Sequence, residues 1–116
     1  MHKAHMRAAI LRELETLSLP TKQLEYERSL AERPGNARSE LTSVFCDDLF
    51  CLRNRSFVDA FSEDELKGLA HLYGLIVEAS TSVNQSHSVS ELLRTPEWRK
   101  VVARAKELYA QLQRDA

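Results

Sequence analysis

Hydrophobic residues recur every three or four positions along most of the chain, which is the spacing of one face of an α-helix. The first run predicts a helix over about residues 3–17. A second helix is expected to begin at Pro20 and to end before the Arg-Pro-Gly-Asn sequence at 33–36. The hydrophobic face of the first helix is Met6, Ala9, Ile10, Leu14 and Leu17, and the weaker face of the second is Leu24, Tyr26, Leu30 and Ala31.

A third helix is predicted in the middle of the chain, between the N-cap residue Asn36 and about residue 52. Its hydrophobic face is Leu41, Val44, Phe45, Leu49 and Leu52. Phe57 and Phe61 then lie four positions apart, which fits a short helical turn before the next long helix.

Ser62 and Glu65 have the Ser-x-x-Glu spacing of a capping box, in which each side chain binds the backbone N–H of the other residue. This spacing predicts a helix that begins after Ser62 and ends near Ala79, followed by a polar loop over residues 80–88. The hydrophobic face of this helix is expected to be Leu66, Leu69, Ala70, Leu72, Tyr73, Ile76 and Val77.

The last part of the chain repeats the same signals. Ser88 and Glu91 form a second Ser-x-x-Glu sequence and open a short helical segment. Thr95 and Pro96 suit the N-cap and first position of a final long helix. Its face is Trp98, Val101, Val102, Ala105, Leu108, Tyr109 and Leu112.

These elements predict an all-α protein: a single compact, bundle-like domain of five to six helices over residues 1–116. The low content of turn-forming residues, with 3 Gly and 3 Pro, favours long helices over the many turns of a β-fold. Residues 1–5 are expected to be disordered or to derive from an expression vector, so we assign no function to His2 or His5.

The charge distribution limits the classes of function that the sequence supports. The 116 residues carry 16 basic and 17 acidic side chains, for a net charge of −1, and the acidic excess falls in residues 41–89. A chain without a basic excess or a basic stripe is not expected to bind nucleic acid directly. No hydrophobic run has the length of a secretion signal or a membrane span, so the sequence predicts a cytoplasmic protein that does not enter a membrane.

The two cysteines, Cys46 and Cys51, are spaced as C-x4-C. A structural zinc site usually has four ligands in closely spaced pairs, and His71 and His87 do not supply a second pair. Glycine-rich phosphate loops and hydrolase motifs are also missing from the sequence, so we expect no metal, no cofactor, no catalytic residue and no enzymatic activity. A redox or ligand role of the cysteines stays open, as does a third alternative in which Asp48 and His71 join them in a metal or enzyme site.

Two groups of carboxylates have a structural and a functional interpretation. Asp48 falls on the hydrophobic face of the predicted third helix, so we expect it to be a structural polar residue that pairs with an arginine or caps backbone N–H groups. Glu63, Asp64 and Glu65 lie in the first turn of a helix and complement its dipole. The alternative for the exposed carboxylates is an acidic surface that attracts a basic partner.

Three stretches follow one another between residues 44 and 112: "VFCDDLF", then "SFVDAFSEDELKGLAHLYGLI", and after a polar loop "SVSELLRTPEWRKVVARAKELYAQL". In this order of features the chain resembles the small all-helical immunity proteins of bacterial contact-dependent and polymorphic toxin systems. In several of those families an aspartate-containing helix precedes a helix that starts with F-S-x-x-E-L. A final helix that begins near a tryptophan then closes the domain.

The resemblance implies a non-catalytic protein that binds the toxin domain made by the same cell and blocks its active site or substrate path. Toxin domains of this kind are often basic nucleases, so the partner-binding residues would be Asp47, Asp59, Glu63 and Asp64. The alternative is a helical adaptor or regulatory module that associates with itself. The two functions differ in oligomeric state, and the sequence is compatible with a monomer or a weak homodimer.

Overall fold

The computed structural model describes residues 2–29, 55–86 and 88–115, and this part of the chain is helical and contains no strand. Its seven helices are α1 (His2–Ser18), α2 (Pro20–Ser29), α4 (Arg55–Asp59), α5 (Glu63–Glu78), α6 (Ser80–Gln85), α7 (Val89–Leu92) and α8 (Pro96–Asp115). The predicted all-α class is confirmed. The described residues hold more helices than the five to six expected, because short helices such as α6 join the long ones.

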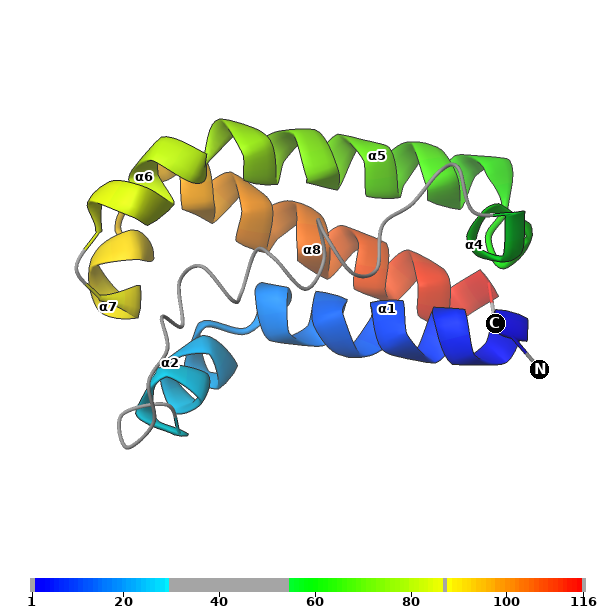
Figure 1. The fold of residues 1–116 in the computed structure, drawn as a ribbon, viewed down its shortest axis with the longest axis horizontal. Helices are drawn as coiled ribbons and strands as arrows, with labels where there is room; N and C mark the ends of the chain where they lie inside the picture. Colours follow the sequence, from blue (N-terminus) through cyan, green and yellow to red (C-terminus); the bar gives the residue numbers. More distant parts are fainter. Residues whose placement is uncertain (1, 30–54, 87, 116) are drawn as a thin grey trace.

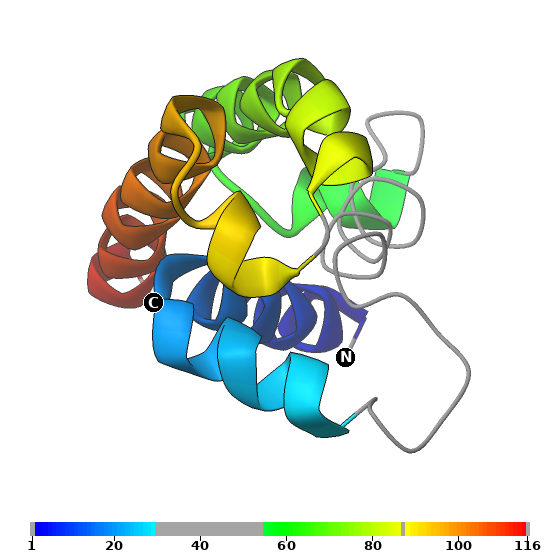
Figure 2. The same ribbon diagram turned by 90° about the vertical axis from the view of Figure 1, so that its left-hand side faces the viewer.

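Three long helices form the frame of the molecule (Figure 1). α8 packs along both α1 and α5, and these are the two most extensive interhelical contacts in the described part. α1 and α5 both run antiparallel to α8, so the start of α1, the start of α5 and the end of α8 meet at one end of the molecule. The end-on view in Figure 2 shows α2 on the side of α1 that lies away from α5, and α7 between α2 and α6.

The hydrophobic core lies where α8 meets its two neighbours. Ile10, Leu14 and Leu17 of α1 are fully buried, and so is the α8 series Trp98, Val101, Ala105, Leu108 and Leu112. These positions agree with the faces predicted from the helical spacing. The radius of gyration is 14.0 Å, close to the roughly 13 Å of a compact domain of this length, which supports a single domain.

The predicted hydrophobic face of α5 was too wide. Leu69, Leu72 and Ile76 are buried as expected, but Ala70 is exposed and the side chain of Val77 is 52% exposed. The helix packs against α8 along one narrow stripe, and positions 70 and 77 fall outside it. Spacing alone cannot separate the edge of a buried stripe from its centre, because neighbouring positions on a helix differ by only about 100°.

α5 and α8 approach each other closely at Gly68. A β-carbon at this position would clash with the Leu108 side chain and lie 3.3 Å from an Arg104 guanidinium nitrogen. The missing side chain therefore lets the two helices come together. Gly74, two turns further along α5, is exposed and has open space around it.

The prediction of a polar loop over residues 80–88 was wrong, since Ser80–Gln85 forms α6. The N–H of Val83 donates to the carbonyl of Ala79 at 2.9 Å, and Val83 is buried in the core, with 5% of its surface exposed. Burial of this valine in the core stabilises a helical turn whose serine, threonine and asparagine residues have little intrinsic preference for it.

The remaining helix starts follow the sequence signals. Thr95 Oγ1 accepts a hydrogen bond from the N–H of Trp98 at 3.3 Å, as expected for the N-cap of α8. Ser88 Oγ likewise accepts from the N–H of Glu91 at 3.1 Å at the start of α7. α1 begins at His2, so residues 2–5, which we expected to be disordered or to derive from an expression vector, are helical, and their origin stays a prediction. The predicted third helix, over residues 36–52, lies outside the described residues.

None of the described helices is both long and apolar enough to cross a membrane.

Candidate functional site

Three of the four predicted partner-binding residues surround one corner of the molecule, where α4 ends and α5 begins. Asp59 is the last residue of α4, and Glu63 and Asp64 begin α5. All three side chains are exposed, and we call them the acidic edge. Glu63 lies 3.7 Å from Lys67, but both side chains are more than two-thirds exposed, so this ion pair contributes little.

The two other predicted aspartates cannot be placed. Asp47, expected to bind a partner, and Asp48, expected to be structural, lie outside the described residues, as do Cys46 and Cys51. His71 is exposed on α5. Among residues 2–29, 55–86 and 88–115, no group of three or more His, Cys, Asp or Glu side chains is arranged to hold a metal ion.

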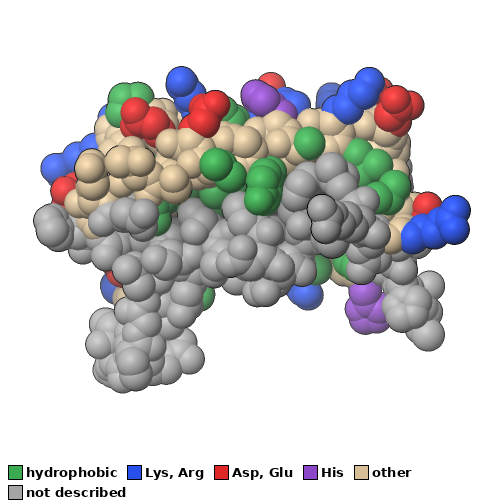
Figure 3. All heavy atoms as spheres, turned by 45° about the horizontal axis from the view of Figure 1, so that its top comes forward, with side chains coloured by type: hydrophobic (Ala, Val, Ile, Leu, Met, Phe, Trp, Pro, Cys, Tyr) green, Lys and Arg blue, Asp and Glu red, His purple; other side chains and the backbone are tan. Residues whose placement is uncertain are grey.

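Acidic and basic side chains are interspersed on the molecular face that carries α5 (Figure 3). The described part of this face therefore does not present one continuous negative field. The acidic edge is a local feature, and its effect on a cationic partner falls off within about 8–10 Å at physiological ionic strength.

Glu65 has a different environment from its acidic neighbours in the first turn of α5. It is 1% exposed, and its Oε1 accepts a hydrogen bond from the N–H of Ser62 at 2.8 Å. Ser62 Oγ in turn accepts from the N–H of Glu65 at 3.2 Å, so the predicted capping box is confirmed. The helical geometry turns Glu65 inward while Glu63 and Asp64 face solvent.

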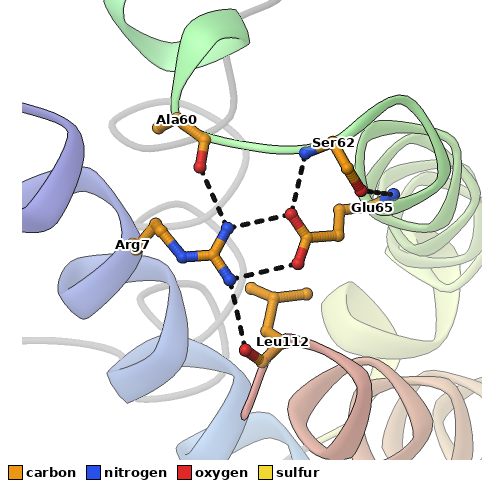
Figure 4. Close-up of polar contacts among 5 residues, drawn as sticks. All are labelled: Arg7, Ala60, Ser62, Glu65 and Leu112. Atoms are coloured by element: carbon orange, nitrogen blue, oxygen red, sulfur yellow. Dashed lines mark hydrogen bonds and ion pairs between the residues drawn. The ribbon is translucent and has the colours of Figure 1, made fainter. Parts of the chain in front are cut away.

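Arg7 of α1 reaches the buried carboxylate of Glu65 with both ends of its guanidinium group (Figure 4). The distances are 2.8 Å from Nη1 to Oε1 and 3.1 Å from Nη2 to Oε2. Nη1 also donates to the carbonyl of Ala60 at 3.0 Å, and Nη2 donates to the carbonyl of Leu112 at 3.1 Å. The guanidinium carbon lies 5.4 Å from the centre of the Phe61 ring, within the range of a cation–π contact.

These contacts make the Arg7–Glu65 ion pair a junction of four elements. Arg7 belongs to α1, Ala60 to the α4–α5 corner, Glu65 to α5 and Leu112 to the last turn of α8, where a cation also complements the helix dipole. The side chain of Arg7 is 22% exposed and that of Glu65 is 2% exposed. Removing one partner of such a pair leaves a buried charge and typically costs about 3–5 kcal/mol.

Arg7 was not among the residues predicted from the sequence to be functional, although its position in the helical pattern is unusual. Arg7, Ile10 and Leu14 are spaced i, i+3 and i+7, so this arginine falls on the hydrophobic face of α1. An arginine in that position needs a buried partner. Because Glu65 is 58 positions away, the sequence alone could not identify that partner.

A second buried polar cluster lies at the other end of α1. Gln23 of α2 is fully buried, and its Nε2 donates to the carbonyls of Thr16 at 3.1 Å and Leu17 at 2.9 Å. Its Oε1 accepts from the indole N–H of Trp98 at 2.9 Å. Nearby, Glu27 accepts from the N–H of Val89 at 2.8 Å and so ties α2 to the start of α7. The side chains of Gln23 and Glu27 therefore both join neighbouring helices.

Glu13 is a carboxyl group whose acidity is changed by burial. Burial raises its pKa from the ordinary value of 4.5 to about 7. Its Oε1 atom is shielded from solvent and has no hydrogen-bond partner. The group therefore stays protonated up to about neutral pH, because the desolvated carboxylate is the less stable form.

The described residues thus present exposed carboxylates at one corner, whereas the part-buried Arg7 and the buried Glu65 and Gln23 bind within the fold. No protein-family model matches the sequence, and comparisons with curated proteins and with solved structures find no match.

Proposed function

We propose that this chain is a non-catalytic immunity protein that binds and occludes a cognate bacterial toxin domain through the acidic edge. The partner would be a basic protein, such as a nuclease domain, and the site of action would be the cytoplasm. The carboxylates of Asp59, Glu63 and Asp64 would then bind the basic side chains of the toxin that otherwise contact the phosphates of a nucleic acid.

The observation that supports this proposal is the fixed arrangement of the acidic edge. Asp59 lies before the corner, and Glu63 and Asp64 lie after it. The capping box and the two contacts of Arg7, to Ala60 and to Glu65, hold the two sides of the corner together. A surface that is already ordered loses little conformational entropy when it binds, which favours tight association.

The test uses a matched pair of charge-reversal variants. Asp59→Lys/Asp64→Lys changes the acidic edge, whereas Glu25→Lys/Glu78→Lys changes two exposed carboxylates elsewhere and alters the net charge by the same amount. Each protein serves as bait in a lysate of the source organism, and captured proteins are identified by mass spectrometry. The captured protein is then expressed alone and with each bait, and cell growth is measured.

We expect one stoichiometric partner whose expression stops growth. Wild type and the Glu25/Glu78 variant should restore growth, and the Asp59/Asp64 variant should bind at least tenfold more weakly, with a salt-dependent affinity. Equal rescue by both variants would show that the acidic edge is not the interface. Capture of a partner that is harmless on expression would rule out the immunity function.

A self-associating helical module is the second candidate, and one observation favours it. The outer side of α5 carries Val77, the one large hydrophobic residue of the described part that is strongly exposed, at 52%. Ala70 and Gly74 extend this side with small residues. Light scattering separates the candidates, since a stable homodimer that is lost in Val77→Asp supports self-association and a monomer supports the immunity function.

A further inference from the structure

The α4–α5 corner buries Phe57, Ala60 and Phe61 in the core, and two kinds of polar contact hold it in addition. Within the corner, the N–H of Ala60 donates to Phe57 at 3.1 Å and the N–H of Phe61 donates to Val58 at 3.4 Å. The capping box of Ser62 then starts α5. These bonds give the corner its local shape, but each of them joins residues only three positions apart.

Arg7 supplies the second kind of contact, which joins the corner to the rest of the molecule. Its guanidinium group binds Ala60 before the corner, Glu65 after it, and Leu112 near the end of α8. The last of these contacts spans 105 positions of sequence. One side chain therefore fixes the corner relative to both α1 and α8.

The central interface of the three long helices does not include this ion pair. There α5 and α1 meet α8 through fully buried hydrophobic residues, including Leu72 of α5, Leu14 of α1 and Ala105 of α8. Loss of the Arg7–Glu65 ion pair removes none of these contacts. An unpaired Glu65 carboxylate would destabilise the closed corner, because the carboxylate is hydrated only when the corner opens.

We infer that the Arg7–Glu65 ion pair is a clasp: when it is broken, residues 55–66 open as a unit while α1, α8 and the rest of α5 stay packed. Because the acidic edge lies on both sides of the corner, its carboxylates keep one arrangement only while the clasp is closed. This functional consequence rests on the proposed function, whereas the clasp itself is a property of the free protein.

Backbone amide hydrogen exchange of the full chain tests the clasp without a partner. The reporters are the N–H groups of Ala60, Phe61 and Ser62 in the corner, compared with those of Ala105 and Leu108 in the centre of α8. Arg7→Gln should raise exchange at the corner by about tenfold or more and change the centre of α8 by less than about twofold. Arg12→Gln, an exposed arginine on the same helix, is the matched control and should change neither.

Two further variants separate the ion pair from the cap. Glu65→Gln keeps a capping residue that accepts from the N–H of Ser62 but removes the buried negative charge, so it should raise corner exchange less than Arg7→Gln does, because no unpaired carboxylate is left in the corner. Arg7→Lys keeps the charge but loses the two-point geometry, and it should give intermediate exchange. If Arg7→Gln does not fold, Arg7→Lys and Glu65→Gln carry the same comparison.

The inference is overturned if corner exchange is unchanged in Arg7→Gln and Glu65→Gln. It is also overturned if exchange rises by one common factor at the corner and in α8, because the pair would then stabilise only the whole fold. Neither result depends on the toxin partner. A clasp that opens as expected, together with an acidic edge whose reversal leaves neutralisation intact, would refute the proposed function and leave the clasp standing.

Discussion

The indole N–H of Trp98 donates a hydrogen bond to the side-chain oxygen of Gln23 across 2.9 Å, and both side chains are fully buried. The amide of Gln23 also donates to two backbone carbonyls at the end of α1, those of Thr16 and Leu17. This one amide group thus joins the α1–α2 connection to the first turn of α8. It supplies the partner of the buried indole N–H of Trp98 and a donor to each of the two carbonyls, of which that of Thr16 also accepts from the N–H of Leu19 at 3.4 Å.

Gln23→Leu is expected to lower the free energy of unfolding by about 1–3 kcal/mol, because the buried indole N–H of Trp98 loses its partner and the carbonyls of Thr16 and Leu17 each lose a donor. Gln23→Glu should also be destabilising, since a carboxylate can accept from Trp98 but cannot donate to the carbonyls of Thr16 and Leu17. Urea unfolding followed by the fluorescence of Trp98 measures both. Gln85→Leu, an exposed glutamine in α6, is the control and should change stability by less than about 0.5 kcal/mol. Equal stability of Gln23→Leu and wild type would contradict the role of the amide.

The two glycines of α5 give opposite predictions for the same substitution. Gly68→Ala places a methyl group against Leu108, so it should destabilise the protein by about 1–3 kcal/mol despite the better helix propensity of alanine. Gly74→Ala meets open space and should stabilise it by about 0.5–1 kcal/mol. Thermal unfolding of the two variants checks the difference. Similar unfolding temperatures would mean that α5 and α8 are not in close contact at Gly68.

The starts of α5 and α8 could be predicted from the sequence because N-terminal capping is local. Ser62 and Glu65 are three residues apart, and so are Thr95 and Trp98, so each pattern lies within a single turn. α6 could not be predicted in this way, because its polar sequence favours a loop and the burial of Val83 decides otherwise. Tertiary packing routinely overrides weak local preference of this kind.

The candidate site was only partly accessible from sequence. Asp59, Glu63 and Asp64 were chosen for their charge, and the structure brings them to one corner. Arg7, which contacts both sides of that corner, comes from near the start of the chain. The pairing of Arg7 with Glu65 depends on how three helices pack, and neither charge nor periodicity encodes a partner 58 positions away.

Thr95→Ala tests the N-cap of α8. Thr95 Oγ1 accepts from the N–H of Trp98, and the substitution leaves this N–H without its partner at the start of the longest helix. We expect a loss of about 1 kcal/mol in the free energy of unfolding. Thr95→Ser should retain most of the stability, because serine caps as well as threonine does. Thr81→Ala, an exposed threonine in α6, should not be destabilising, and an equal loss there would show that the effect is not one of capping.

The last prediction concerns pH and follows from Glu13, whose pKa burial raises from 4.5 to about 7. Below pH 4.5 the carboxyl group is protonated in both the folded and the unfolded chain, so it contributes no pH dependence. Between pH 4.5 and 7 the folded chain binds the proton more tightly than the unfolded chain does. The contribution of Glu13 to stability therefore falls as pH rises through this range, and above pH 7 the full penalty is present.

Glu13→Gln removes the ionisable group and keeps its size. At pH 8 the variant should be more stable than wild type by up to about 3 kcal/mol, and near pH 4 the two should be nearly equal. Urea unfolding at intervals between pH 4 and 8 measures the difference. If the Glu13→Gln difference did not grow between pH 4.5 and 7, the carboxyl group would be ionised in the folded protein. Its burial would then not set its protonation state.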